Sequence, residues 1–240
     1  MILIICFILG SFSASAQISF QELAHINSAT HMAFEKIKAS ERDILIINEA
    51  VNGNERFWWD QATTYASYSG LEIGEAIEHR VFLFGGYARL EGMTGDGVAQ
   101  TICHELGHGF AGAPYKDNGS PSEGQSDYFS TKSCLKYIFK FYNQKNLVSD
   151  PYIIDFCHRN SDDQAFCERG MESIKTEIIF FTSLGDETSL SNYSQAEAIR
   201  INSSNRFYPE AQCRIDTMIH GLIGAKRPRC WFPGGIKRIL

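Results

Sequence analysis

The chain has 240 residues, of which 44% are hydrophobic and 21% are charged, a composition typical of one substantial globular domain or two small ones. This balance excludes a wholly disordered chain. The formal net charge of −6 argues against a general nucleic-acid-binding protein, because phosphate contacts need clustered lysines and arginines.

The first sixteen residues, MILIICFILGSFSASA, are typical of a secretory signal peptide. An apolar run is followed by small residues, and Ala14-Ser15-Ala16 matches the A-x-A pattern that precedes cleavage. No lysine or arginine precedes the run, so an uncleaved anchor is the alternative, although the run is short for a bilayer span. We predict a signal peptide at 1–16 and one mature domain at 17–240, which is periplasmic or secreted and has no stable membrane span.

Cleavage would remove Cys6 and leave an even number of cysteines in an exported chain, which predicts three disulfides. Six cysteines allow 15 pairings, so the connectivity stays open. Cys157 with Cys167 and Cys213 with Cys230 would close short loops. Cys103 with Cys134 would join the two segments that carry the candidate site described below.

The first half of the chain predicts one helix and two strands. Apolar residues recur at three- and four-residue intervals over 18–38, which indicates an amphipathic helix. DILIINEAV at 43–51 is a short β-rich run, and RVFLFGGYARL at 80–90 is a stronger strand. The glycine pair inside this second strand indicates a bulge or a close backbone approach.

The second half predicts a series of helices. One begins near Thr94 or Asp96 and ends at the glycines before Pro114. The next begins with Ser120 as its N-cap and Pro121 in its first turn. Further helices are expected at about 163–183 and 208–223.

The segment TICHELGHGF carries two histidines four residues apart. On a helix, His104 and His108 lie one turn apart on the same face, so both can direct a ring nitrogen at one zinc ion. Glu105 lies beside them and would accept the proton of the attacking water as a general base. A catalytic zinc site normally has three protein ligands, so one ligand is still missing.

The segment EGQSDYF supplies the best candidate for the third ligand. Glu123 and Asp127 are four residues apart near the start of a helix, so both carboxylates fall on one face. Glu123 is predicted to bind the metal. Asp127 is predicted to hydrogen-bond the outer nitrogen of a ligating histidine and so fix its tautomer.

With these residues the chain resembles the gluzincin metallopeptidases, whose pattern is H-E-x-x-H followed on a later helix by E-x-x-x-D. The resemblance covers about 50 residues, 80–130. A metzincin site is excluded, because Ala111 and Pro114 stand where that type has glycine and histidine. The resemblance implies an α+β, mostly helical zincin-like domain in its minimal form, with one zinc ion per chain. It also implies that the strand at 80–90 is an edge strand that pairs with an extended peptide.

Several roles stay open at this point. Glu123 also fits a capping box with Ser120, Asp127 fits a solvated helix position, and Cys103 is a conceivable zinc ligand. A side chain that would stabilise the reaction's oxyanion is not identified, and the candidates are Tyr128, His158, Arg214 and His220.

The function that the sequence predicts is an exported, monomeric zinc metalloendopeptidase that acts on peptide or protein substrates. One alternative is a catalytically silent binding or structural module on a zincin scaffold. A second is a zinc hydrolase of a non-peptide amide, since specificity depends on the loops around such a site.

Overall fold

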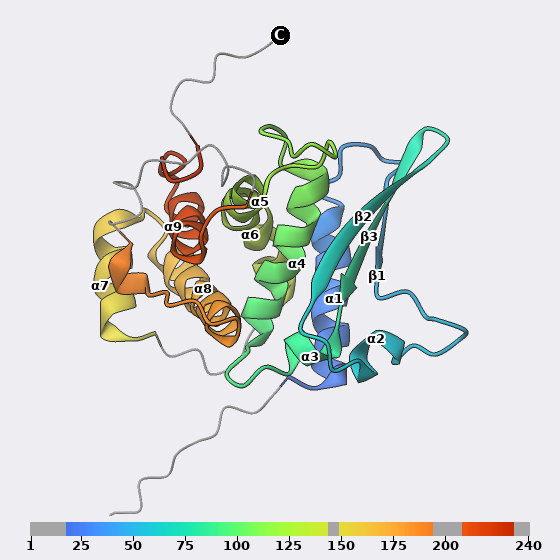
Figure 1. Ribbon diagram of the computed structural model, residues 1–240, viewed down its shortest axis with the longest axis horizontal. Helices are drawn as coiled ribbons and strands as arrows, with labels where there is room; N and C mark the ends of the chain where they lie inside the picture. The colour runs from blue at the N-terminus through green and yellow to red at the C-terminus, as the bar shows by residue number, and fades with distance from the viewer. Residues whose placement is uncertain (1–17, 144–148, 194–207, 233–240) are drawn as a thin grey trace, which may run out of the picture.

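The computed structural model describes residues 18–143, 149–193 and 208–232, and it has the mostly helical α+β architecture that the sequence predicted (Figure 1). The predicted signal peptide at 1–16 lies outside the described residues. Within the described ranges, no helix combines the length and the apolar character that a bilayer span requires.

A mixed sheet lies at one side of the molecule. In the described residues it contains β1 (Ile44–Ile47), β2 (Ala66–Ile73) and β3 (Ala76–Leu83), in the order β1-β3-β2. β1 runs parallel to β3, and β2 runs antiparallel to it. The hairpin between β2 and β3 turns at Gly74, whose φ of +63° is a conformation that glycine adopts without steric cost.

The strand predicted at 80–90 is corrected in two respects. It ends at Leu83, and Gly85–Ala88 forms the short helix α3 instead. A close backbone approach does occur there, because a Cβ on Gly85 would collide with the carbonyl oxygen of Trp59. In addition, β3 is the central strand and not an edge strand. The edge next to it is β2, which the sequence did not reveal because its second half is exposed and lacks an alternating pattern.

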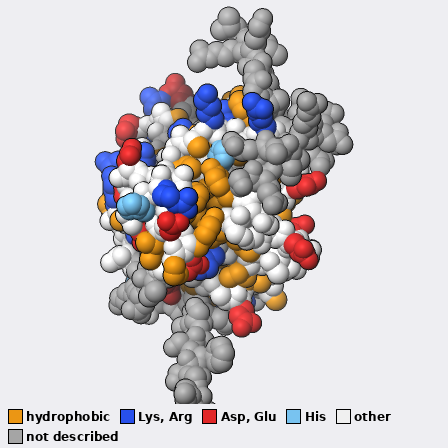
Figure 2. Space-filling model, turned by 90° about the vertical axis from the view of Figure 1, so that its left-hand side faces the viewer, with side chains coloured by type: hydrophobic (Ala, Val, Ile, Leu, Met, Phe, Trp, Pro, Cys, Tyr) orange, Lys and Arg blue, Asp and Glu red, His pale blue; other side chains and the backbone are white. Residues whose placement is uncertain are grey.

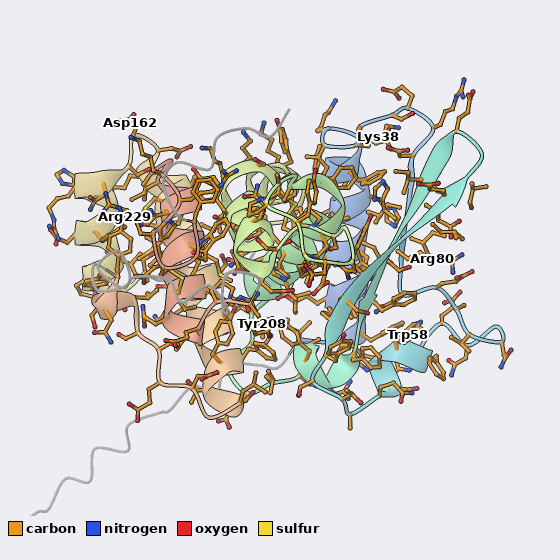
Figure 3. All side chains as sticks on the ribbon, turned by 45° about the horizontal axis from the view of Figure 1, so that its top comes forward. Lys38, Trp58, Arg80, Asp162, Tyr208 and Arg229 are labelled. Carbon is orange, nitrogen blue, oxygen red and sulfur yellow. A yellow bond between two sulfur atoms is a disulfide. The ribbon has the colours of Figure 1, made fainter. Side chains whose placement is uncertain are left out.

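The inner face of the sheet covers two helices, α1 (Phe20–Phe34) and α4 (Gly95–Phe110) (Figure 1). Val81 and Leu83 of β3 are fully buried in this layer. Trp58 and Arg80 lie on the other side of the sheet, away from α1 and α4 (Figure 3). The alternation of buried and outward side chains along β3 is that of a strand with one covered face.

Helices α5, α6 and α8 pack against α4, whereas α9 packs against α5 and α8, and α7 packs against α8. Three expected helices are confirmed with small changes at their ends: α1, α8 (Gln164–Ser183) and α9 (Ala211–Leu222). The sequence did not predict α7 (Pro151–Asn160), although Asp150 caps its N-terminus and Pro151 occupies its first turn. The remaining elements are the short α2 (Phe57–Asp60) and the 3₁₀ turn η2 (Leu190–Asn192).

The helix predicted from Ser120 begins three residues later than expected. It consists of α5 (Glu123–Phe129), a π-helical turn η1 (Ser130–Cys134) and α6 (Leu135–Phe141). Ser120 is not the N-cap, because Tyr115 and Pro121 form a β-bridge that keeps the preceding segment extended. Ser122 takes the N-cap position without a side-chain capping bond. Glu123 is therefore the first helical residue, and the predicted capping box does not form.

Three disulfides are present, and they use the pairs suggested by the sequence. Cys103–Cys134 joins α4 to η1, Cys157–Cys167 joins α7 to α8, and Cys213–Cys230 joins α9 to the segment that follows it. Cys103 is therefore no thiolate ligand, and that alternative is excluded. Three disulfides are typical of proteins that fold in an oxidising, exported environment.

Two hydrophobic cores meet near α4. The larger lies between the sheet, α1, α4 and α6, and the smaller between α7, α8 and α9. On the face where α7 is outermost, hydrophobic side chains gather near the centre (Figure 2), and Tyr152 and Ile154 of α7 are exposed. The buried polar residues described next lie between the two cores, where α4 and α5 face α8 and α9.

Candidate metal centre

The three predicted ligands come together at one point. His104 and His108 lie on the last two turns of α4, and Glu123 is the first residue of α5. The Nε2 atom of His104 is 3.2 Å from Oε2 of Glu123, and Nε2 of His108 is 3.6 Å from Oε1. One ligand atom from each residue lies within 4.8 Å of the others. Two tetrahedral ligands that are each about 2.0–2.2 Å from one ion are about 3.3–3.6 Å apart, so the two histidine–glutamate separations suit a shared metal ion.

Close packing of α4 against α5 brings the third ligand to the histidines. Gly107 lies between the two turns of the motif, and a Cβ at this position would be only 2.7 Å from the Cα atom of Ser126 on α5. The absence of a side chain at Gly107 therefore lets the two backbones approach. The disulfide of Cys103 with Cys134 ties the same two segments on another face of α4.

Hydrogen bonds orient the rings of both histidines. Nδ1 of His108 is 3.1 Å from the carbonyl oxygen of Pro121 and 3.0 Å from the Ser126 hydroxyl. A carbonyl oxygen can only accept, so Nδ1 carries the proton and Nε2 keeps its lone pair. Nδ1 of His104 is 2.8 Å from Oδ1 of Asp127. Burial lowers the pKa of His104, but Asp127 and Glu123 outweigh burial and raise it to about 10, so a metal ion would replace the proton on Nε2. Both Nε2 atoms are directed toward Glu123, as metal binding requires.

Asp127 occupies the position next to His104 that the sequence predicted for it. Its carboxylate accepts two hydrogen bonds from Arg214 of α9, at 2.8 Å and 2.9 Å. Burial raises the pKa of Asp127, but the charges of Arg214 and His104 outweigh burial and hold it below its ordinary value. Asp127 therefore stays ionised and keeps the His104 ring in place. The alternative interpretation of Asp127 as a solvated helix residue is wrong, because its side chain is fully buried.

Arg214 is the candidate among the four oxyanion stabilisers that the structure places against the predicted ligands. Its Nη2 atom is 3.5 Å from Oε2 of Glu123. The hydroxyl of Tyr128 donates to the carbonyl oxygen of Ala225, and Nδ1 of His220 donates to that of Lys226. His158 is exposed on α7. Because Arg214 is buried in its pair with Asp127, its position suits holding the ligands in place more than contacting a substrate.

Lys116 is a contact of the site that sequence reasoning missed. Its Nζ atom is 2.9 Å from Oε1 of Glu123. Burial raises the pKa of Glu123, whereas His104, Arg214 and His108 lower it by a larger amount, so this carboxylate is ionised. Lys116 lies in the loop after α4, and a single lysine in a loop carries no sequence signal for such a contact.

Glu105 lies on the same side of α4 as the histidines and is 7% exposed. Burial, opposed by the charge of His104 and reinforced by that of Glu123, raises the pKa of Glu105 to about 7. Its carboxylate makes no hydrogen bond to another described residue and retains contact with solvent. A carboxylate that is both free and poised near neutral pH is suited to general base catalysis.

Comparison with known proteins identifies no relative: no family model, curated protein or solved structure matches the chain. The geometry of the site therefore carries the functional argument.

Proposed function

We propose that this protein is an exported zinc peptidase of the gluzincin type, in which His104, His108 and Glu123 hold one zinc ion and Glu105 is the general base. The observation that carries the proposal is the convergence of three ligand atoms within 4.8 Å beside a free, buried carboxylate. Imidazole and carboxylate donors in this number suit a catalytic zinc site, which keeps one coordination position for water.

The chain's own residues account for the proton transfers of peptide hydrolysis. Zinc at this site would lower the pKa of a water molecule to about 7 and polarise the scissile carbonyl. Glu105 would take a proton from the attacking water and deliver it to the leaving amine. Asp127 and Arg214 would keep the His104 ring oriented throughout, because their bidentate pair is buried.

Glu105 favours an enzyme over a silent metal-binding module. A structural zinc site has four protein ligands, whereas the described residues bring three together here. A purely structural site would also not need an unbonded carboxylate next to the ligands. The cost of burying such a group, about 1–3 kcal/mol when it lacks partners, is expected at a functional site.

The edge of the sheet favours a peptide over another amide substrate. In the described residues β2 pairs only with β3, so its other edge has free backbone groups. Its Tyr68 lies beside Gly109, the residue after His108, where a Cβ would collide with the Tyr68 hydroxyl. We therefore assign to β2 the edge role that the sequence predicted for the strand at 80–90. An extended peptide would pair its backbone with β2 near the metal ligands.

Metal analysis combined with a cleavage assay tests the proposal. The refolded, disulfide-intact protein should contain one zinc per chain and should cleave a general protein substrate in a chelator-sensitive manner. Glu105→Gln should keep the zinc and lose at least about a hundredfold in turnover, because it removes the base and no ligand. Stoichiometric zinc without cleavage would favour the silent module, and loss of zinc in Glu105→Gln would mean that the role of Glu105 is misassigned.

A further inference from the structure

A second buried carboxyl group contacts Thr101, which lies one helical turn before the general base on α4. Glu177 of α8 is 6% exposed, and its Oε1 atom accepts hydrogen bonds from Thr101 at 2.8 Å and from Tyr87 at 3.0 Å. The Tyr87 hydroxyl is itself 2.6 Å from the Thr101 hydroxyl. Three oxygen atoms from α3, α4 and α8 thus meet at one point, and neither the proposed reaction nor the metal ligands use them.

The other carboxylate oxygen of Glu177 has no partner. In the described part of the chain Oε2 makes no hydrogen bond, and Glu177 forms no ion pair with a lysine, arginine or histidine. Oε2 is also not fully enclosed, because it is absent from the buried atoms that lack a partner. Burial raises the pKa of Glu177, and the hydrogen bonds from Thr101 and Tyr87 together with the more distant charges of His104 and Arg214 offset only part of this effect.

The position of Thr101 connects this oxygen to the candidate metal centre. Thr101, His104, Glu105 and His108 are spaced as i, i+3, i+4 and i+7 and form one face of α4. Thr101, His104 and Glu105 keep 6–8% exposure, whereas Ile102, Cys103 and Leu106 on the other faces have none. This face therefore keeps limited contact with solvent, and Glu177 meets it at Thr101, one helical turn before Glu105.

The same side of α8 leads to an open cavity with a negative rim. Phe181, one turn after Glu177, packs with Tyr208 around the guanidinium of Arg214, at 5.3 Å and 5.4 Å. Phe181 and Tyr208 also line a cavity of about 390 Å³, and Tyr208 lies at the boundary between the α8–α9 side and the α4 side of the molecule (Figure 3). Three carboxylates line this cavity as well: Asp186, Glu187 and Glu210. The charge of Arg214 is paired with Asp127, and the three carboxylates give this cavity an acidic lining that suits a cationic group.

From this geometry we infer that Glu177 is a substrate-binding residue whose free carboxylate oxygen receives an ammonium or guanidinium group of the peptide, next to the bond that is cleaved. This inference rests on the proposed peptidase function and narrows its substrate class to cationic peptides. Thr101 and Tyr87 act as positioning residues that hold Oε1, so that Oε2 stays free.

Two groups of a peptide have this chemistry: the free N-terminal amine and the side chain of lysine or arginine. The first would make the protein an aminopeptidase, and the second an endopeptidase with a basic preference. The alternative is that Glu177 has a structural role only and links α8 to α3 and α4 through its hydrogen bonds. A structural tether would affect stability and leave the choice of substrate unchanged.

Substrate profiling separates these outcomes. Wild type, Glu177→Gln and Glu177→Asp would be incubated with synthetic peptides of diverse sequence, each with a free and with an acetylated N-terminus, and cleaved bonds would be identified by mass spectrometry. Glu168→Gln on the exposed side of the same helix is the matched control. Zinc content and thermal unfolding are measured for every variant.

We expect wild type to prefer peptides with the cationic group by at least about tenfold in kcat/KM, the selectivity of one charged hydrogen bond. Glu177→Gln should remove this preference and keep the zinc and the cleavage of neutral peptides. Glu177→Asp and Glu168→Gln should retain it. If acetylation of the N-terminus removes the preference, the group bound by Glu177 is the N-terminal amine. If the preference instead depends on a lysine or arginine in the peptide, the bound group is that side chain.

Binding gives a second readout that does not need turnover. Affinities of matched cationic and neutral peptides for Glu105→Gln, with and without Glu177→Gln, would be compared by calorimetry, and the tenfold ratio should disappear in the double variant. An equal preference in Glu177→Gln and wild type, or none in wild type, would overturn the assignment of Glu177. Absence of zinc or of chelator-sensitive cleavage would instead refute the peptidase, and the binding comparison would still decide the role of Glu177.

Discussion

Gly107 offers a direct test of how the third ligand reaches the histidines. Its backbone contacts Ser126 on α5, and a Cβ would lie 2.7 Å from the Cα atom and 2.9 Å from the Cβ atom of Ser126. Carbon atoms in contact are normally at least about 3.5 Å apart. Gly107→Ala should therefore push α5 away from α4 by about 0.8 Å, since the contact is with the backbone of Ser126, which no side-chain rotation can relieve.

This displacement is large compared with the tolerance of a metal site. Zinc–ligand distances are held to within about 0.2 Å, and Glu123 is on the helix that moves while His104 and His108 are not. Losing an outer-sphere partner already costs about 10- to 100-fold in metal affinity, so a displaced ligand should cost at least about tenfold. Alanine is the better helix former by about 1 kcal/mol, which limits the loss of stability in the metal-free protein.

Zinc affinity of Gly107→Ala would be measured by competition with a chromophoric chelator, together with thermal unfolding with and without zinc. We expect weaker zinc binding and a smaller stabilisation by zinc than in wild type. Unchanged affinity would show that α4 and α5 can separate without moving the ligands, or that Glu123 is no ligand, and would refute this account of the site.

Two further outcomes follow from the same contacts. Glu123→Ala should fold with its disulfides but retain little zinc after dialysis, whereas Ser120→Ala should keep stoichiometric zinc, because Ser120 does not cap α5; full zinc in both variants would place the third ligand elsewhere. Replacing Cys103 and Cys134 together by alanine should lower the free energy of unfolding by about 3.7 kcal/mol through the entropy of the 31-residue loop, as measured by urea denaturation; a loss below about 1 kcal/mol would contradict it.

The residues of the candidate site could largely be read from local sequence. His104, Glu105 and His108 share one face because of helix geometry alone, and Glu123 and Asp127 do so for the same reason. Short loops also favoured two of the three disulfide pairs. Local spacing is sufficient in these cases, since the residues concerned are neighbours along one helix or one loop.

Tertiary structure decided everything that joins distant segments. Arg214 is 87 residues from Asp127, and Glu177 is 76 residues from Thr101, so no periodicity relates the two members of either pair. Lys116 reaches Glu123 from a loop whose path depends on packing.

The order of the strands was equally out of reach, because β2 has too few buried residues to give an alternating pattern, yet it pairs along its whole length with β3. The sequence by itself determined which side chains can bind a metal, since that depends on spacing within a helix. The packing of α8, α9 and the sheet around the site decides which charges surround these side chains and which strand borders them. Burial of apolar side chains in the two hydrophobic cores sets that packing.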